Sequence, residues 1–412
     1  MIEIGLLGLG TVGLGVYEII NLKRGIPLQD KDLHIKKILV KNLDKKRPVV
    51  PEPGMLTDTF EDIISDDEIS IVVCVTGGLD PELSNIRRSL EAGKHVVTAN
   101  KEIIAEHIDE LIHLAQENGV NILFEASVGG GIPIINSIVE TLKINRITKI
   151  QGILNGTTNF ILTKIADEKR SFADILSEAQ SLGLAEADPS ADVDGYDVMR
   201  KISILASMSF RTLVKQEEVH LRGIGNITLD DIMMADYFGY KAKFLGQALL
   251  ENSQYSVSVT PVLISKNSVI ANVDAEYNIV LIEGDIIGEL CFMGKGAGKD
   301  ATANSVVSDI LKITAGDINY SHIRFDDNLV SYGLTGIMNE YYIRVNILNY
   351  SEFEKTINLI SSTVKKDRLI YQDGKIYFIT EMLNAADMKI LFNDLQKVSD
   401  NVFYARLENN LL

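Results

Sequence analysis

A glycine motif near the start of the sequence restricts the fold more than any other feature. Gly8-Leu9-Gly10-Thr11-Val12-Gly13 follows the apolar segment Ile2–Leu7 directly and opens a helical pattern. In such a strand–turn–helix unit the first glycine permits a tight turn, the second lets the backbone approach a pyrophosphate, and the third lets the helix pack on the strand. The helix N-terminus then faces the phosphates. The motif therefore predicts a dinucleotide site formed by Gly8, Gly10, Thr11, Val12 and Gly13.

Strands and helices alternate over the first 130 residues. The segments expected as strands are Ile2–Leu7, His34–Val40, Ser70–Thr76, His95–Thr98 and Val120–Glu125. Several of them are apolar on both faces, which is typical of a parallel sheet covered by helices on both sides. The helices expected between them are Val12–Asn21, Pro81–Ala92 and Ile104–Glu117. Residues 1–130 are therefore predicted to form an α/β domain of the Rossmann type, a doubly wound parallel sheet.

The remaining residues follow two other patterns. Short β-rich runs between Tyr255 and Cys291 indicate a second α/β domain with a mixed, mostly antiparallel open sheet, assigned to residues 131–300. A helix expected over residues 301–316 can return to pack on the first domain. Residues 341–412 have the order β-α-β-β-α-β, with a hairpin at Asp373-Gly374, which predicts a small ferredoxin-like domain. Such a domain serves either oligomerisation or regulation by a bound ligand.

The charge and the cysteines argue against several classes of protein. The chain has 57 acidic and 40 basic residues, a net charge of −17, and no cluster of basic and aromatic residues, so it is not expected to bind nucleic acid. No run reaches the length of about 18 apolar residues that a membrane span needs. Cys74 and Cys291 each lie in an apolar run, which predicts two buried, reduced thiols in a cytoplasmic protein.

Three loops at the ends of predicted strands are candidates for contact with the cofactor. The strand His34–Val40 is followed by Lys41 and further lysines, with no acidic residue at its tip. Cations there can hold a 2′-phosphate, whereas an acidic residue would bond a 2′-hydroxyl, so NADP is favoured over NAD. A solvated lysine-rich loop explains the same residues equally well. Thr76, Gly77 and Lys101 follow the next strands and are expected near the nicotinamide.

A carboxylate and a glycine run occur together over residues Glu125–Pro133. Such a run can turn backbone carbonyls toward a cation or amides toward an anion. It serves equally well as a hinge between domains. The residues alone leave these alternatives open.

The densest charged cluster lies between Glu186 and Lys201. Five carboxylates occur within twelve positions, and Asp197 shares a helix face with Lys201 because the two are four residues apart. A solvated acidic loop before a helix is the ordinary explanation. Lys201, however, leads into an apolar helix, and desolvation of a lysine makes its neutral amine available as a proton acceptor. The cluster is therefore a candidate site for binding an amino acid and exchanging a proton with it.

Taken together, these motifs resemble those of homoserine dehydrogenases, NAD(P)-dependent enzymes that interconvert aspartate 4-semialdehyde and homoserine in the biosynthesis of threonine, methionine and isoleucine. The resemblance follows the whole chain in order, through GLGTVG, TANK, EASVGGGIPII, GILNGTTNFIL, EADPSADVDGYDVMRK and GAGKDATA. The C-terminal domain resembles the ACT domain that many members carry. The resemblance implies a cytoplasmic oxidoreductase that acts on a small molecule as a homodimer or homotetramer.

The resemblance also implies roles for individual residues in the reaction. Lys201 matches the lysine that donates and accepts the proton, and Lys101 matches the lysine that positions the reacting oxygen. Glu186 and Asp197 match the carboxylates that hold the amino group of the substrate, with Asp192 in support.

Further residues correspond to the family's binding loops. Gly156 and Thr157 match a substrate loop, and Gly296 matches a glycine near the cofactor. Members of the family also bind a monovalent cation, usually sodium. In this chain its ligands would be Glu125, Val128, Gly130 and Ile132.

One segment departs from the family pattern. ACT domains that bind amino acids usually have a glycine turn between their first strand and helix, but residues Asn346–Phe353 contain neither glycine nor proline. Feedback regulation by threonine is therefore only a hypothesis.

Two alternatives to this function are considered. The first is another amino-acid or semialdehyde dehydrogenase with the same cofactor domain. Of these, an aspartate-semialdehyde dehydrogenase would need a nucleophilic cysteine in a polar loop, and neither Cys74 nor Cys291 lies in one. A regulatory protein of the same fold that binds the cofactor without catalysis is the second alternative.

Overall fold

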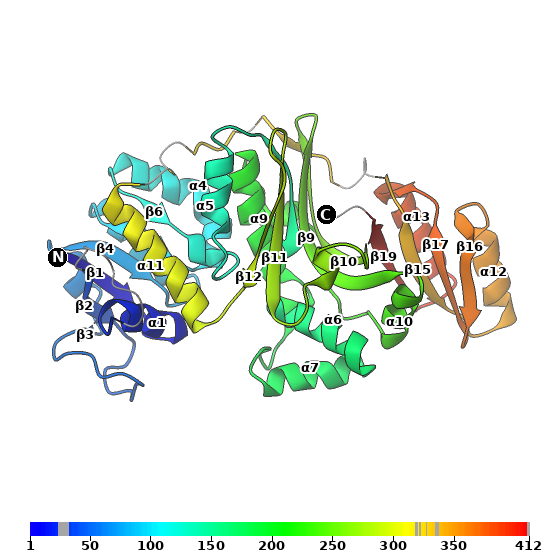
Figure 1. Ribbon diagram of the computed structural model, residues 1–412, viewed down its shortest axis with the longest axis horizontal. Helices are drawn as coiled ribbons and strands as arrows, with labels where there is room; N and C mark the ends of the chain where they lie inside the picture. The colour runs from blue at the N-terminus through cyan, green and yellow to red at the C-terminus, as the bar shows by residue number, and fades with distance from the viewer. Residues whose placement is uncertain (24–32, 318–319, 321–322, 327, 334–337, 410–412) are drawn as a thin grey trace. The chain divides into compact units, whose positions relative to one another are not determined.

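The computed structural model describes residues 1–23, 33–317, 320, 323–326, 328–333 and 338–409 (Figure 1). They divide into two units, each assembled from three stretches of chain. The first comprises Met1–Thr148, Ser203–Gln216 and Ile282–Asn328, and the second comprises Lys149–Ile202, Glu217–Leu281 and Leu329–Leu412. In the described part of the chain, no helix is long and apolar enough to cross a membrane. The domain boundaries expected from the sequence stay a prediction.

The first unit contains a six-stranded sheet in the order β3-β2-β1-β4-β5-β6, in which neighbouring strands run parallel. The strands are β1 (Ile2–Leu7), β2 (Leu33–Leu39), β3 (Leu56–Thr57), β4 (Ile69–Cys74), β5 (His95–Thr98) and β6 (Ile122–Leu123). The strand order reverses at β1, and ligands of such sheets bind outside the carboxyl ends of the strands at that point. The predicted Rossmann-type sheet is confirmed. Strand β6 is shorter than expected because Glu125 already belongs to a 3₁₀ turn, η1 (Glu125–Ser127).

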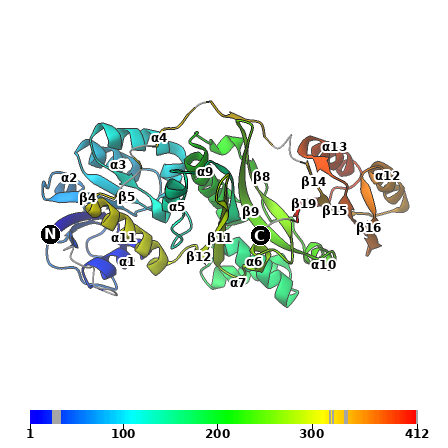
Figure 2. The same cartoon turned by 45° about the horizontal axis from the view of Figure 1, so that its top comes forward.

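Helices cover both faces of this sheet, with α3 and α4 on one side and α1 and α11 on the other (Figure 2). The helices of the first unit are α1 (Thr11–Ile20), α2 (Glu61–Ile64), α3 (Glu82–Glu91), α4 (Lys101–Glu117), α5 (Ile134–Thr141) and α11 (Lys299–Ala315). Helix α11 comes from far along the chain and packs against α1. Lys299 of α11 donates to both carboxylate oxygens of Glu18 on α1, at 3.0 and 2.8 Å.

The second unit is built on a mixed sheet whose centre is the long antiparallel pair β9 and β10. Its strands follow the order β11-β7-β9-β10-β19-β15-β17-β16. The first four are β11 (Tyr277–Gly284), β7 (Ile147–Ile153), β9 (Tyr240–Glu251) and β10 (Gln254–Ser265). The helices are α6 (Gly156–Glu168), α7 (Phe172–Ser181), α8 (Ser190–Val193) and α10 (Leu229–Tyr237), together with the first part of α9 (Tyr196–Phe210), whose residues from Ser203 on belong to the first unit. Buried aliphatic side chains of these strands, among them Ile153, Leu245, Val262 and Ile279, form a core cluster.

The last seventy residues or so continue this sheet. Their elements are β15 (Tyr341–Asn346), α12 (Tyr350–Ile360), β16 (Val364–Gln372), β17 (Lys375–Thr380), α13 (Ala385–Gln396) and β19 (Val402–Glu408). Strand β15 runs antiparallel to both β17 and β19, which gives the ferredoxin-like arrangement predicted from the sequence. Strand β19 also pairs in parallel with β10, so the four strands extend the larger sheet. That this part is an ACT domain stays a prediction.

A buried ion pair fastens these C-terminal strands to α10. Arg344 of β15 is 1% exposed, and its Nε donates to Oδ1 of Asp231 at 2.9 Å. The Tyr342 hydroxyl donates to the same oxygen at 2.9 Å. The other carboxylate oxygen of Asp231 accepts hydrogen bonds from Thr228, which completes a capping box at the start of α10. One carboxylate therefore links a helix cap to the C-terminal strands.

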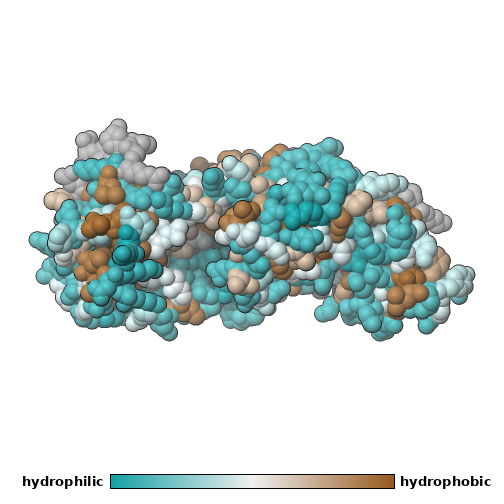
Figure 3. Space-filling model, turned by 90° about the horizontal axis from the view of Figure 1, so that it is seen from below, coloured by the Kyte–Doolittle hydropathy of each residue, from teal (hydrophilic) through white to brown (hydrophobic). Residues whose placement is uncertain are grey.

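One expectation about the cysteines is wrong. Cys74 is buried as predicted, but Cys291 is exposed. Cys291 lies on β12 (Gly288–Lys295), a strand on which every residue is at least partly exposed. The apolar run around Cys291 therefore does not belong to the hydrophobic core. On the face drawn in Figure 3, hydrophilic side chains predominate and hydrophobic ones form small separate patches.

Candidate functional site

The glycine motif forms the turn between β1 and α1. Gly8 has a φ of 98°, and the third glycine, Gly13, is in close contact with it, since a Cβ on Gly13 would lie 2.1 Å from the carbonyl oxygen of Gly8. Around Gly10, in contrast, nothing lies within 4 Å of the Cβ position. Gly10 is also the N-cap of α1, whose first turn contains no acidic residue. The turn thus leaves an open helix N-terminus, an arrangement that attracts phosphate.

We expect the two glycines to respond differently to an added methyl group. Gly13→Ala should lower the free energy of unfolding by about 1–3 kcal/mol, because the backbone must move to admit the Cβ. Gly10→Ala should change it by less than about 0.5 kcal/mol but weaken binding of NADPH, since the methyl occupies the open space before the helix. Denaturant unfolding and fluorescence titration with NADPH measure the two effects. Equal stability of both variants would contradict the conclusion that Gly13 is needed for the close contact with the Gly8 carbonyl.

The loops after β4 and β5 are joined by a residue that the sequence analysis missed. Glu82 of α3 is buried, and its carboxylate accepts hydrogen bonds from the backbone N–H groups of Thr76, at 2.7 Å, and Gly77, at 3.0 Å. Asn100 donates to Glu82 and to the Gly78 carbonyl, and its side-chain oxygen caps α4. Burial raises the pKa of Glu82, while these donors lower it. Lys101 is therefore the first residue of a helix whose start is fixed by Asn100.

The loop after β2 carries the predicted basic residues. Lys41 is exposed, as are Lys45 and Lys46. Arg47, which the sequence analysis did not single out, folds back onto this loop and donates to the carbonyls of Leu43 and Lys45, at 3.2 and 2.8 Å. The loop thus presents several cations beyond the end of β2.

Glu125 and most of the glycine run that follows it are buried. The Glu125 carboxylate accepts hydrogen bonds from the N–H groups of Ile135 and Asn136, at 2.8 and 2.9 Å, at the start of α5. Burial raises the pKa of Glu125, and these donors partly offset the effect. Val128, Gly130 and Ile132 are also buried. Carboxylate and carbonyl oxygens suit a hard cation, so the donor set fits the predicted monovalent ion.

The glycine run is packed against the second glycine motif. A Cβ on Gly130 would lie 2.5 Å from the carbonyl carbon of Gly296 and 2.8 Å from the amide nitrogen of Ala297. The Gly130 carbonyl accepts a hydrogen bond from Ser305 Oγ at 2.6 Å, which leaves it a second lone pair. Gly130 and Gly296, predicted for the cation and for the cofactor, therefore lie side by side.

Asp309 of α11 is a second buried carboxylate at this place, and the sequence analysis missed it. It is 0% exposed, and its Oδ2 accepts a hydrogen bond from the backbone N–H of Glu125 at 2.9 Å. Burial, with the charge of Glu125, raises the pKa of Asp309 to about 8. Among the described residues, no three His, Cys, Asp or Glu side chains are grouped to hold a metal. A cation at Glu125 must therefore draw on backbone carbonyls.

In the second unit, Lys201 lies in a buried network around Asn155. Lys201 is 8% exposed, and its Nζ donates to Asp197 Oδ2 and to the Leu154 carbonyl, both at 2.7 Å. Asn155 donates to Asp197 at 2.9 Å and to Asp192 at 2.6 Å, and its own oxygen caps α6. The structure thus brings Asp192, Asp197 and Lys201 together through an asparagine that the sequence analysis did not assign.

The other predicted substrate residues lie at the edge of this network. Gly156 is the first residue of α6, directly after Asn155. The Thr157 hydroxyl donates to the Leu184 carbonyl at 2.7 Å. Glu186 is exposed, and its carbonyl accepts a hydrogen bond from Gln180 at 3.0 Å. The helix α6 and the segment that bears Glu186 are thereby held together.

Comparisons with known proteins identify the family of this chain. A family model described as "Homoserine dehydrogenase" matches residues 133–311, and one described as "Homoserine dehydrogenase, NAD binding domain" matches residues 8–125. A homoserine dehydrogenase of Bacillus subtilis is 38% identical over 99% of both chains. The chain belongs to the homoserine dehydrogenase family. A crystal structure of a homoserine dehydrogenase from Thiobacillus denitrificans matches with a TM-score of 0.89 and 33% identity, over 99% of this chain and 98% of that one.

Membership in the homoserine dehydrogenase family decides between the functions considered above. The chain is an NAD(P)-dependent oxidoreductase with an NAD-binding and a catalytic region, as the two family matches indicate. A regulatory protein without catalysis is not supported. A hyperthermophilic archaeal homoserine dehydrogenase mutant whose structure contains NADPH is 29% identical, with a TM-score of 0.66, over 76% of this chain and 98% of its own. A nicotinamide cofactor is therefore the cofactor class of this chain.

Proposed function

We propose that Lys201 is the general acid and base of the homoserine dehydrogenase reaction. The observation that carries this proposal is the buried hydrogen bond between Lys201 and Asp197, with the Leu154 carbonyl as second acceptor. These two acceptors hold the ammonium in one orientation, as a proton donor to a developing alkoxide requires. Asp197, Asp192 and the exposed Glu186 supply negative charge for the amino group of the substrate, with Gly156 and Thr157 in the adjoining loop.

The first unit binds the cofactor in this proposal. The open N-terminus of α1 at Gly10, Thr11 and Val12 receives the pyrophosphate, and Thr76, Gly77 and Gly296 border the rest of the site. The bound nicotinamide supplies the hydride. Lys101, at the carboxyl end of β5, stabilises negative charge on the reacting oxygen.

NADP is the proposed cofactor because exposed lysines, Lys41 among them, lie in the loop after β2. We expect kcat/KM with NADPH to exceed that with NADH by about tenfold or more, since one charged hydrogen bond contributes about 1.5–3 kcal/mol. Rates of cofactor oxidation with aspartate 4-semialdehyde test both activity and preference. Lys41→Ala should lower kcat/KM for NADPH and leave that for NADH unchanged. Equal rates with both cofactors would contradict the NADP assignment, and no rate with either would contradict the reaction.

The remaining parts of the proposal concern the cation, the assembly and the location. A sodium ion is held by the Glu125 carboxylate and the carbonyls of Val128, Gly130 and Ile132, a buried set of hard oxygen donors. The protein works in the cytoplasm as a homodimer or homotetramer. Residues 1–130 with the helix of 301–316 bind the cofactor, residues 131–300 bind substrate, and residues 341–412 form an ACT-like domain.

A further inference from the structure

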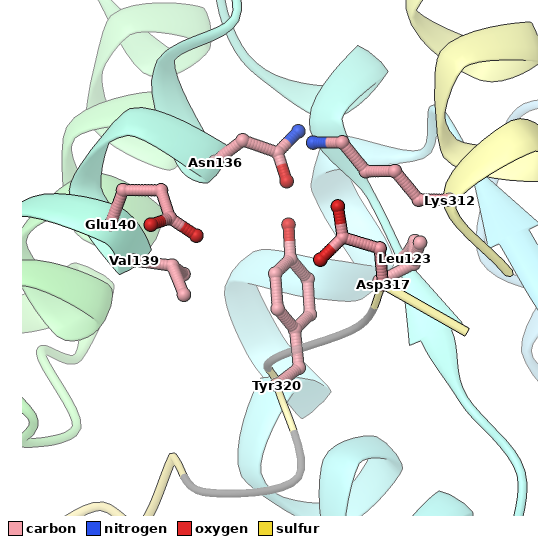
Figure 4. Close-up of a pocket in the computed structure, with 7 residues that line it drawn as sticks. All are labelled: Leu123, Asn136, Val139, Glu140, Lys312, Asp317 and Tyr320. Atoms are coloured by element: carbon pink, nitrogen blue, oxygen red, sulfur yellow. The ribbon is translucent and has the colours of Figure 1, made fainter. Parts of the chain in front are cut away.

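A small cavity with polar and apolar walls opens in the first unit near β6, α5 and α11. Its volume is about 50 Å³, room for a few water molecules. In Figure 4, the side chains of Asn136, Lys312, Asp317 and Tyr320 converge on its centre. The full lining consists of Leu123, Asn136, Val139, Glu140, Lys312, Asp317 and Tyr320.

The hydroxyl of Tyr320 points to a ligand or water in this cavity. Tyr320 is 4% exposed, and its hydroxyl has no hydrogen-bond partner among the residues that the structure describes. In Figure 4 this hydroxyl is directed into the cavity. The ring packs on Phe124, the residue before Glu125, with the ring centroids 5.2 Å apart. Buried hydroxyls are almost always paired, so an oxygen donor or acceptor, or a cation, is expected there.

Asn136 connects the cavity to the two buried carboxylates described above. Asn136 lines the cavity, and its side-chain amide donates to the Glu125 carboxylate. Asp309 binds the Glu125 backbone through Oδ2, while its Oδ1 has no hydrogen-bond partner within the described part of the chain. An unpaired carboxylate oxygen therefore lies next to the residue proposed to hold the cation.

The charges at this place suit a monovalent ion. A bound cation favours the ionised form of both carboxylates, so Glu125 and Asp309 would then carry two negative charges, and Lys312, three residues after Asp309 on the same helix face, carries one positive charge. A single monovalent cation balances the difference, whereas a divalent ion would exceed it. Asp317 and Glu140, both exposed, add negative charge at the cavity and favour the approach of cations.

We propose that Asp309 is a second carboxylate of the monovalent cation site and that the cavity beside Tyr320 is the hydrated route by which the ion reaches it. This inference rests on the proposed cation at Glu125. Asp309 Oδ1 contacts the ion from the side of α11, and the backbone N–H of Glu125 fixes the carboxylate in place. The Tyr320 hydroxyl hydrogen-bonds a water that stays with the bound ion, so it contributes to the affinity as well as to entry.

The affinity for sodium can be measured without catalysis. The unfolding temperature of the full chain is recorded against NaCl concentration, with choline chloride added to keep the ionic strength constant. A ligand that binds only the folded state raises this temperature in a saturable way. Asp309→Asn should weaken the apparent sodium affinity about 10- to 100-fold, and Tyr320→Phe about two- to tenfold. Asp109→Asn, on the exposed face of α4, is the control and should match the unaltered chain.

The outcomes separate this inference from the cation assignment on which it rests. If the unaltered chain shows no sodium-specific rise, the proposed cation at Glu125 is wrong. If Glu125→Gln removes the rise while Asp309→Asn retains the full affinity, the cation assignment stands and Asp309 is not a ligand. If Asp309→Asn does not fold, Tyr320→Phe still decides, because an unchanged sodium affinity in that variant overturns the route through the cavity.

Discussion

Lys201→Ala should lower kcat by about 100-fold or more, the usual scale for loss of a general acid and base. The physical reason is specific to this site. The Lys201 ammonium is the group held between Asp197 Oδ2 and the Leu154 carbonyl, and alanine leaves no proton donor in its place. Steady-state kinetics with aspartate 4-semialdehyde measure the loss. Because Lys201 belongs to the catalytic region and not to the glycine turn, NADPH binding should persist.

Lys201→Arg is the matched control for this prediction. Arginine keeps a positive charge beside the buried Asp197 carboxylate, but it does not lose its proton at working pH. We expect Lys201→Arg to fold normally and still lose most of its turnover. A rate within a few-fold of the unaltered enzyme for either variant would show that Lys201 is not the proton donor.

Arg344→Leu should lower the free energy of unfolding of the second unit by about 3–5 kcal/mol, as is typical when one partner of a buried ion pair is removed. Asp231 is 0% exposed and would lose the guanidinium that compensates its burial. Arg344 also donates to Asn346 and Asn401, at 2.9 and 2.8 Å, so the variant leaves these two acceptors unpaired as well. We expect this loss of stability to exceed the stabilisation that the leucine side chain gains by packing.

Hydrogen exchange locates this effect better than a single unfolding curve, because a chain with two units need not unfold in one step. Amide protection in β15 and β19 should fall before protection in β9. Lys143→Leu, which removes the exposed ion pair with Glu140, should change stability by less than about 1 kcal/mol. Unchanged protection in β15 of Arg344→Leu would mean that packing alone holds the C-terminal strands.

Local features of the site could be predicted from the sequence because their geometry is set within a few residues. The glycine motif at Gly8–Gly13 fixes a turn, and Asp197 and Lys201 share a helix face by their spacing alone. The start of α6 is also a local feature, since Asn155 is a typical N-cap residue, although only a substrate loop at Gly156 and Thr157 was expected there.

Contacts between distant segments could not be predicted in this way. The bond between Asp309 and Glu125 joins residues 184 positions apart, and only the fold of α11 onto the first unit brings them together. A hint was present, because Asp309 lies among apolar residues on the buried face of α11. The burial of Glu82 and the exposure of Cys291 could not be predicted for a related reason. An acidic residue is usually exposed and a cysteine in an apolar run is usually buried, but tertiary packing gives the opposite result in both cases.

The pairing of β19 with β10 has a consequence for the synthesis of the chain. One edge of β10 lacks this partner until residues 402–408 have been made, more than 130 residues after β10 itself. A nascent chain therefore carries an open strand edge for most of the translation of its second half, and open edges can pair with other chains. Removal of the last strand would leave Val262–Ile264 of β10 without this partner permanently, so we expect it to promote aggregation.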